Sequence, residues 1–154
     1  MTKSVPNGYF YEDLNVGATI NHSIGRPVTQ VDNRLVADLT GFSHPLHTDV
    51  TYAETTEFGN ITLSGIATFS IVYGISSSLL SRNVITNLEW TDVKFINPVY
   101  IGDALYAKSE IIFKRESKSR PTQGIIHVKT LGVNQHSNIV ISFDRAFLIK
   151  RKYS

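Results

Sequence analysis

The stretch GIATFSIVYGISSSLL, residues 65–80, is the most apolar part of the chain and decides how the rest must be arranged. Apolar side chains recur on nearly every side of a helix drawn through it, which is typical of a helix that other structure surrounds. Its β-branched residues leave a strand as a competing interpretation, but the length favours a helix. Gly74 and the serines at 76–78 interrupt it, and it is shorter than the roughly 18 residues of a membrane span. We therefore expect a buried central helix and no membrane segment.

The part of the chain after this helix has the period-two pattern of antiparallel strands. Apolar positions alternate with charged ones along residues 105–114, which predicts a strand with one buried face. Residues 125–133 and 139–150 flank the polar group 134–138, which predicts a hairpin, and residues 98–103 form the preceding turn. A long apolar helix followed by such strands predicts an α+β fold, in which a curved antiparallel sheet wraps around the central helix.

Two shorter helices are predicted before the central one. Thr29 can cap a helix, with Asp32 three positions later, and Gly41 ends it. An irregular loop containing Pro45 follows. Asp49 can then cap a short helix over residues 50–56.

Composition limits the classes of function. The 154 residues suit one domain over 1–154, and 42% hydrophobic against 18% charged residues indicate an ordinary folded core. Fifteen Lys and Arg balance thirteen Asp and Glu, for a net charge of +2, so we expect no nucleic-acid partner. With no cysteine and no apolar stretch near the N-terminus, we expect a cytoplasmic protein without disulfides.

A motif upstream of the central helix carries a family resemblance. The segment TGFSHPLHTD, residues 40–49, is followed by Tyr52-Ala53, Phe58-Gly59 and Ser64-Gly65. Together they resemble the hydratase motif of the MaoC-like dehydratases, also called (R)-specific enoyl-CoA hydratases. Further matches in the family's order lie nearer the C-terminus, at Val93-Lys94-Phe95, Pro98-Val99 and Gly102-Asp103. The resemblance implies a single hot dog fold domain.

The resemblance also implies an activity. Members of the family often hydrate trans-2-enoyl thioesters of coenzyme A or acyl carrier protein to (R)-3-hydroxyacyl thioesters, or run the reverse dehydration. They are usually dimerised edge to edge, with the thioester bound near the subunit interface, so we expect a homodimer and no cofactor. On this chain, His47 matches the catalytic histidine, and Gly65 matches the glycine whose N–H polarises the thioester carbonyl. We expect the same partners here.

The chain departs from the family's motif at three positions. Phe42 stands where the family has the catalytic Asp, five residues before His47, while His44 replaces an Asn and Ser64 replaces a His. Hydration needs one proton taken from water and another delivered to carbon, and phenylalanine can do neither. Losing one general acid or base typically lowers the rate about 10²- to 10⁴-fold.

Three outcomes follow from the missing carboxylate. His44 or Asp38 could replace it, since both are close to position 42 in the sequence. The site could instead run other thioester chemistry with His47 alone, as a specialised lyase, an isomerase or a thioesterase. As a third outcome, the chain could be a non-catalytic acyl-binding subunit of a heterodimer.

The remaining candidate residues are assigned to substrate binding. We expect the acyl group to contact five side chains, namely Phe42, Pro45, Leu46, Ser64 and Tyr73. The two histidines of the motif do not predict a metal site, because Pro45 breaks helical spacing between them and the chain has no cysteine.

Overall fold

A computed structural model describes residues 7–152. The predicted domain over 1–154 includes residues 1–6 and 153–154, which lie outside the described residues. In chain order the elements are the 3₁₀ helix η1 (Tyr11–Asp13), β1 (Thr19–Pro27), α1 (Gln30–Thr40), the 3₁₀ helix η2 (Pro45–His47), α2 (Val50–Glu54), α3 (Gly65–Leu80), β2 (Val84–Phe95), β3 (Ala104–Glu116), β4 (Gln123–Asn134) and β5 (Ile139–Lys150).

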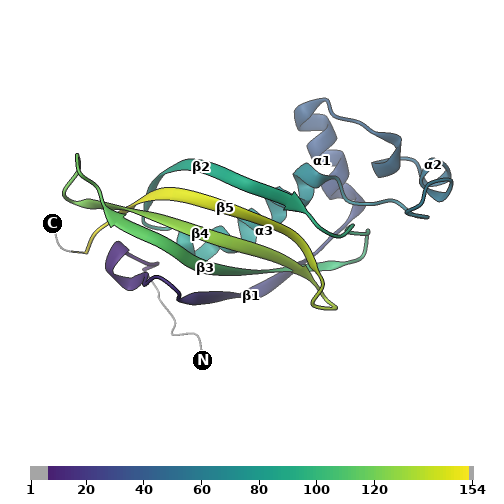
Figure 1. The fold of residues 1–154 in the computed structure, drawn as a ribbon. Helices are drawn as coiled ribbons and strands as arrows, with labels where there is room; N and C mark the ends of the chain where they lie inside the picture. The colour runs from purple at the N-terminus through teal and green to yellow at the C-terminus, as the bar shows by residue number, and fades with distance from the viewer. Residues whose placement is uncertain (1–6, 153–154) are drawn as a thin grey trace.

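The five strands form one antiparallel sheet in the order β1-β3-β4-β5-β2. The sheet curves, and α3 lies along one face of it (Figure 1). This confirms the predicted α+β architecture. The predicted hairpin is β4 and β5, and its turn is held by the Asn134 side chain, whose Oδ1 accepts from the N–H groups of His136 and Asn138.

The core lies between α3 and the sheet and has two parts. Val72 and Phe143 lie in one group of buried apolar residues, and Leu80 and Phe147 in the other. Arg145 is 2% exposed, and its guanidinium lies over the Phe147 ring, 4.6 Å from the ring centroid. The layer between sheet and helix therefore contains a buried cation as well as apolar side chains.

The helix α1 forms where its capping signals predict it. The Asp32 carboxylate accepts from the backbone N–H of Thr29 at 2.8 Å, and Gly41 ends the helix with a φ of 71°. Together with η2 and α2, it forms a separate group at one end of the sheet (Figure 1). The short helix predicted over residues 50–56 is two residues shorter than expected, so its predicted C-terminal end is wrong. It stops at Glu54, because the hydroxyls of Thr55 and Thr56 bond back to carbonyls of its last turn.

One face of α3 is not covered by the rest of the chain. Ser70, Gly74 and Ser78, spaced four residues apart, are exposed along it, as is Ile66 near the start of the helix. The expectation that structure surrounds α3 on nearly every side is therefore wrong for this face. Its residues are mostly small, so covering this face would bury little apolar area and would add little to the stability of the fold.

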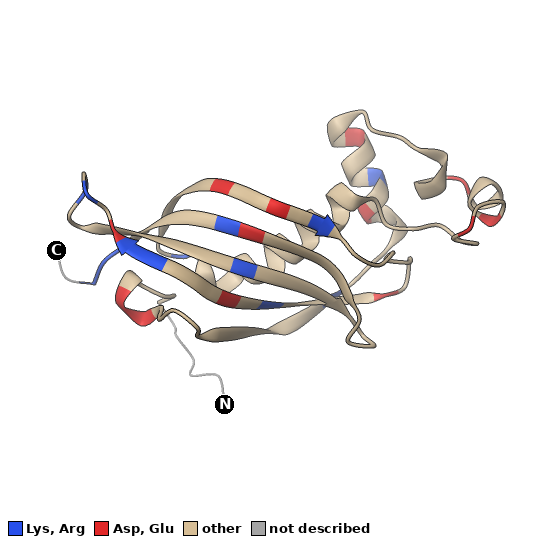
Figure 2. Cartoon of the chain, in the orientation of Figure 1, with Lys and Arg blue, Asp and Glu red and all other residues tan. Residues whose placement is uncertain are grey.

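Charged side chains of both signs are interspersed over the strands, and α3 carries none (Figure 2). Within β2, Lys94 pairs with Asp92, while Lys129 of β4 lies within 4.0 Å of both Asp92 and Asp144 of β5. None of the helices within residues 7–152 is long and apolar enough to cross a membrane.

Candidate functional site

The loop that carries His47 is held by its own short-range hydrogen bonds. The Nδ1 atom of His44 accepts from the backbone N–H of Leu46 at 3.2 Å and so caps η2. Asp49 caps α2 by accepting from the N–H of Tyr52 at 3.1 Å. His47 is at the end of η2, so these two capping bonds hold the backbone on both sides of it.

The His47 ring is fixed by the chain segment that precedes α3. Its Nδ1 atom lies 2.9 Å from the carbonyl oxygen of Thr62 and 3.3 Å from the hydroxyl of the same residue. A carbonyl oxygen only accepts, so Nδ1 carries the hydrogen in this bond. In the neutral ring, Nε2 is then the unprotonated nitrogen, which has the lone pair that a general base needs.

Asn33 joins the His47 loop to the start of α3. Its Nδ2 atom donates to the carbonyl oxygens of His47 and Thr62, at 3.0 Å each, and its Oδ1 accepts from the N–H of Ser64 at 2.9 Å. Gln30, three residues earlier on α1, also donates to the His47 carbonyl, at 2.7 Å. Asn33 is 3% exposed, and its three bonds join α1 to two other backbone segments, the loop at His47 and residues 62–64.

The sequence analysis missed Asn33 and Gln30. Their partners are 14 to 31 residues away in the chain, so no local pattern indicates them. The only available signal was an asparagine inside a predicted helix, where this residue is unfavourable unless its side chain finds a partner.

The N-terminus of α3 supplies backbone donors. Ser64 is the N-cap, and its hydroxyl accepts from the N–H of Ala67 at 3.3 Å. Gly65 is the first helical residue, so its N–H has no acceptor within the helix. A Cβ atom at position 65 would lie 2.9 Å from Cζ of Phe95, at the end of β2. The Phe95 ring therefore lies directly against this glycine, a contact that the sequence did not indicate.

Two aromatic rings of the motif lie beside His47. The Phe42 ring centroid is 6.1 Å from that of His47, and the His44 centroid is 5.9 Å from it. Phe42 is 45% exposed, so it forms a wall next to the imidazole rather than part of the core. Pro45 is exposed and Leu46 half-buried in the same turn.

Two other candidate residues, Asp38 and Tyr73, make their contacts outside the loop that carries His47. The Asp38 carboxylate pairs with Arg34 at 2.9 Å on the exposed side of α1. Tyr73 stacks on Phe69, and its hydroxyl accepts from Asn87 at 3.3 Å. Burial raises the pKa of Tyr73, but hydrogen bonds and the nearby Arg145 outweigh it, so that the pKa lies below its usual value. Tyr73 thus belongs to an aromatic cluster two helical turns beyond Gly65.

The donor set at the site does not suggest a metal. Within residues 7–152, no group of three or more His, Cys, Asp or Glu side chains is placed to hold a metal ion. What the site offers is an imidazole with a free Nε2 and helix N-terminal N–H groups, both tied to Asn33. This combination suits proton transfer next to a carbonyl group that gains negative charge.

Comparison with curated proteins gives two similar relatives. One is a β-methylmalyl-CoA dehydratase from Chloroflexus aurantiacus, 30% identical over 99% of this chain and 43% of that protein. The other is a mesaconyl-CoA hydratase from Cereibacter sphaeroides, 28% identical over 94% of this chain and 42% of that protein. The chain therefore spans less than half the length of these two relatives.

Solved structures agree with the fold. A monoamine oxidase regulatory protein from an Archaeoglobus species is 30% identical, with a TM-score of 0.84 over 95% of this chain and 97% of that one. A Mycobacterium tuberculosis protein described as a double hot dog fold is 17% identical, with a TM-score of 0.89 over 98% of this chain and 47% of that one. The sheet wrapped around α3 is thus a hot dog fold. The family model of the MaoC-like domain matches residues 13–133. The chain belongs to the MaoC-like family.

Proposed function

We propose that this protein is a hydratase or dehydratase of acyl-CoA thioesters, with Nε2 of His47 as the proton-transferring group. The observation that supports it most is the bond from Nδ1 of His47 to the Thr62 carbonyl, because it leaves Nε2 unprotonated in the neutral ring. Two CoA-thioester lyases among the relatives support the substrate class.

The reaction adds water across the double bond of an enoyl thioester. Nε2 of His47 takes a proton from water as the water oxygen bonds to C3. The electron pair of the double bond moves towards the thioester carbonyl, and the N–H of Gly65 stabilises the resulting enolate oxygen. A proton then reaches C2, and dehydration is the same path in reverse.

The proton for C2 needs a donor that Phe42 cannot provide. His44 is the proposed second group, because its ring lies 5.9 Å from that of His47. Its Nδ1 accepts from the Leu46 N–H, so Nε2 carries the hydrogen in the neutral ring. To act as the acid, His44 takes up a second proton on Nδ1 in place of this bond, and it returns to the neutral ring when it protonates C2. Asp38 is a weaker candidate, since its carboxylate is engaged by Arg34.

The substrate is proposed to be a thioester with a short acyl group. The two curated relatives are named for mesaconyl-CoA and β-methylmalyl-CoA, and short acyl groups suit a site with Phe42 as a wall. Phe42, Pro45, Leu46 and Ser64 are the proposed binding residues. A carrier-protein thioester is the alternative, which the assay below separates.

The working unit is proposed to be a homodimer joined at β2. This strand is at an edge of the sheet and exposes large apolar side chains, among them Leu88, Trp90, Val93 and Phe95. An apolar edge strand with unpaired backbone groups is a site for pairing with another chain. The Mycobacterium tuberculosis protein with a double hot dog fold, of which this chain covers 47%, supports a working unit of two such domains.

A second candidate function is favoured by Phe42 alone. Without the motif carboxylate, the chain could act on a thioester by other chemistry, such as thioester hydrolysis, or could bind an acyl group beside an active partner. Thioester hydrolysis predicts release of free thiol, which hydration does not produce, and a non-catalytic subunit predicts no turnover by the isolated homodimer.

The test follows the absorbance of the enoyl thioester with crotonyl-CoA and mesaconyl-CoA, and with crotonyl carrier protein. We expect turnover by the wild type on a CoA thioester and at least a 10²-fold loss in His47→Ala. His136→Ala, in the exposed β4–β5 turn, is the matched control and keeps full rate. An inactive wild type that gains hydration in Phe42→Asp overturns the hydratase proposal, as does turnover that survives His47→Ala.

A further inference from the structure

The ring of Phe95 lies at the start of α3, beside the proposed oxyanion donor. Three atoms at the tip of the ring, Cζ, Cε1 and Cε2, lie 2.9, 3.1 and 3.3 Å from the position that a Cβ atom on Gly65 would take. Only glycine leaves this position empty, so the ring can approach the backbone closely here. The Phe95 side chain is 58% exposed, so its ring borders open space and is not part of the core.

The geometry of a helix start places this ring on the side where a bound thioester would lie. At the N-terminus of a helix the free backbone N–H groups point outward along the axis, and each Cα–Cβ bond is tilted the same way. Gly65 is the first residue of α3, so its N–H and the tip of the Phe95 ring lie beyond the same end of the helix. A carbonyl group bound by the Gly65 N–H would therefore lie next to Phe95.

A regular strand would not direct Phe95 towards α3. Trp90, five positions earlier on β2, faces the helix, because its ring packs edge-on against Tyr73 at a centroid distance of 5.6 Å. Successive side chains of a strand point to opposite faces, so residues an odd number of positions apart are on opposite faces. Phe95 nevertheless faces the same helix as Trp90, through its contact with Gly65. The strand must therefore contain an extra residue between them.

A β-bulge supplies the extra residue. Thr91 pairs with Asp144, and Lys94 pairs with Ser142. Two residues of β2 therefore lie opposite a single residue of β5, and the first of them is Asp92. It has a φ of 50°, in the left-handed region, which is unfavourable for residues other than glycine but is tolerated best by Asp and Asn. Such bulges re-aim side chains and are frequent next to functional sites. This one turns the end of β2 towards α3.

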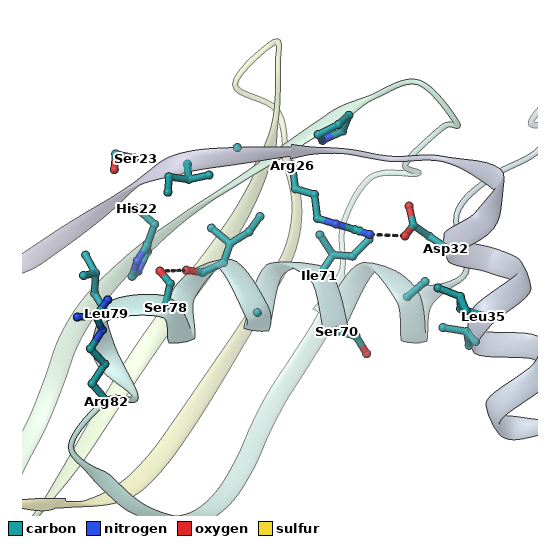
Figure 3. A pocket seen from close by; sticks show the side chains of 17 residues that line it. His22, Ser23, Arg26, Asp32, Leu35, Ser70, Ile71, Ser78, Leu79 and Arg82 are labelled. Atoms are coloured by element: carbon teal, nitrogen blue, oxygen red, sulfur yellow. Dashed lines mark hydrogen bonds and ion pairs between the residues drawn. The ribbon is translucent and has the colours of Figure 1, made fainter. Parts of the chain in front are cut away.

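A cavity of about 720 Å³ beside α3 does not include this contact. It lies along the uncovered face of the helix and is enclosed by residues 22–27 of β1 and by α1 (Figure 3). Its lining includes neither Gly65 nor Phe95. The space in front of Phe95 is therefore separate from this cavity, so a substrate group that meets the ring gains no room from it.

The proposed reaction decides which part of the acyl group meets Phe95. The thioester carbonyl carbon, C1, lies at the Gly65 N–H, and C3 lies at His47, which takes the proton from water. A substituent on C2 is next to C1 and so is close to the Phe95 ring. A longer chain extends beyond C3, at the end where Phe42 lies beside His47. Bulk on C2 and bulk beyond C3 therefore meet different aromatic rings.

We propose that Phe95 is a specificity-determining residue, whose ring limits the size of the substituent on C2 of the acyl group. The bulge at Asp92 holds the ring in the position that this role requires. The inference rests on the proposed hydratase function, because that function sets how the thioester lies between Gly65 and His47.

The test compares two isomeric substrates, trans-2-hexenoyl-CoA and (E)-2-ethyl-2-butenoyl-CoA, which carry the same extra carbons either beyond C3 or on C2. An extra methylene against a pocket wall typically changes kcat/KM about 10- to 200-fold, and a partly exposed ring should have a smaller effect. We expect Phe95→Ala to shift the ratio of kcat/KM towards the branched isomer by at least about fivefold. Ile85→Ala, which removes an exposed apolar side chain at the other end of β2, is the matched control and keeps the wild-type ratio.

The role of the bulge is tested with two substitutions of Asp92. Valine is β-branched and disfavours a φ of 50°, so Asp92→Val should move the ratio in the same direction as Phe95→Ala. Asp92→Asn tolerates this φ and should keep the wild-type ratio. An unchanged ratio in Asp92→Val overturns the role of the bulge.

Thermal unfolding and sedimentation equilibrium establish that each variant is folded and assembles as the wild type does. If the wild type hydrates none of these thioesters, the hydratase proposal fails, and the role of Phe95 is then tested by calorimetric binding of the saturated isomers hexanoyl-CoA and 2-ethylbutanoyl-CoA. Phe95→Ala should shift the ratio of affinities towards the branched isomer by the same factor. A smaller shift in Phe95→Ala, an equal shift in Ile85→Ala, or failure of both saturated isomers to bind an inactive wild type overturns the inference.

Discussion

His47 and Asn33 share one acceptor, the carbonyl oxygen of Thr62, at distances of 2.9 Å and 3.0 Å. The same asparagine also holds the backbone carbonyl of His47 and the N–H of Ser64. The imidazole and the N-terminus of α3 are therefore positioned by one side chain, although they come from separate segments. This arrangement fixes the relation between the proposed base and the proposed oxyanion donor.

Replacement of Asn33 should impair catalysis more than binding. In Asn33→Ala the His47 loop and the start of α3 lose their common partner, and small displacements of catalytic groups cost up to about 10²-fold in rate. We expect kcat to fall about 10- to 100-fold with KM nearly unchanged, measured with the enoyl-thioester assay. Stability should fall by about 1–3 kcal/mol, because backbone groups are left without partners.

Gln30→Ala is the control for this prediction, because it removes only one bond to the His47 carbonyl. It should retain most of the kcat. If the two variants lose equal activity, or if Asn33→Ala changes KM alone, Asn33 does not position the catalytic groups.

Gly65→Ala should disturb the contact between α3 and β2. The added Cβ would lie 2.9 Å from Cζ of Phe95, so the ring must shift. Phe95 is 58% exposed and meets the Cβ with the far end of its ring, so the ring can move away and the cost should be below about 1 kcal/mol. Chemical denaturation should show a loss of that size at most, and the double variant Gly65→Ala/Phe95→Leu should recover part of it. No recovery would show that the strain lies elsewhere.

Stability should decrease in mild acid because of His22. Its pKa is lowered from 6.5 to about 4 by burial, so between these values the unfolded chain binds a proton that the folded chain does not. The free energy of unfolding is then highest above pH 6.5 and falls as the pH drops towards 4, by up to about 3 kcal/mol in total.

Comparison with His22→Phe isolates this effect. Carboxylates with lowered pKa, such as Asp32 and Asp13, also lose stability in acid, but they do so in both proteins. The difference between wild type and variant should therefore change with pH only across the histidine window. Parallel curves from pH 7 to pH 4 would contradict the lowered pKa of His22.

A charge on the β2 edge should dissociate the proposed dimer. Val93→Lys places a cation on the exposed apolar edge, while Val16→Lys changes a residue that is 59% exposed outside the strands. We expect sedimentation equilibrium to show monomers for the first variant and dimers for the second. A wild type that is monomeric at micromolar concentration contradicts the proposal directly.

The sequence predicted those elements whose signals are local. Three predictions of this kind are confirmed, and each depends on neighbouring residues alone. They are the cap formed by Thr29 and Asp32, the end of α1 at Gly41 and the helix formed by the apolar run of α3. His47 and Gly65 were found from the family motif. The chemistry that they perform stays a prediction.

What the sequence could not show depends on residues far apart in the chain. Phe95 lies against Gly65 from thirty positions away, and Asn33 bonds to three distant backbone groups. The alternating pattern of β1 did not mark His22 as buried, because a polar residue on a buried face breaks that pattern. Such contacts depend on how the elements pack against one another, and the hydrophobic pattern within a single element carries no information about this.

The half-exposed ring of Phe42 has a consequence for the evolution of this site. Its side chain contributes little to the core, and its backbone N–H is held by Thr40, so residue 42 can be exchanged without disturbing the bonds that Asn33 makes. Selection can therefore alter the acid or base at this position while the scaffold stays folded. One inherited framework can thus diversify its reactions through single substitutions.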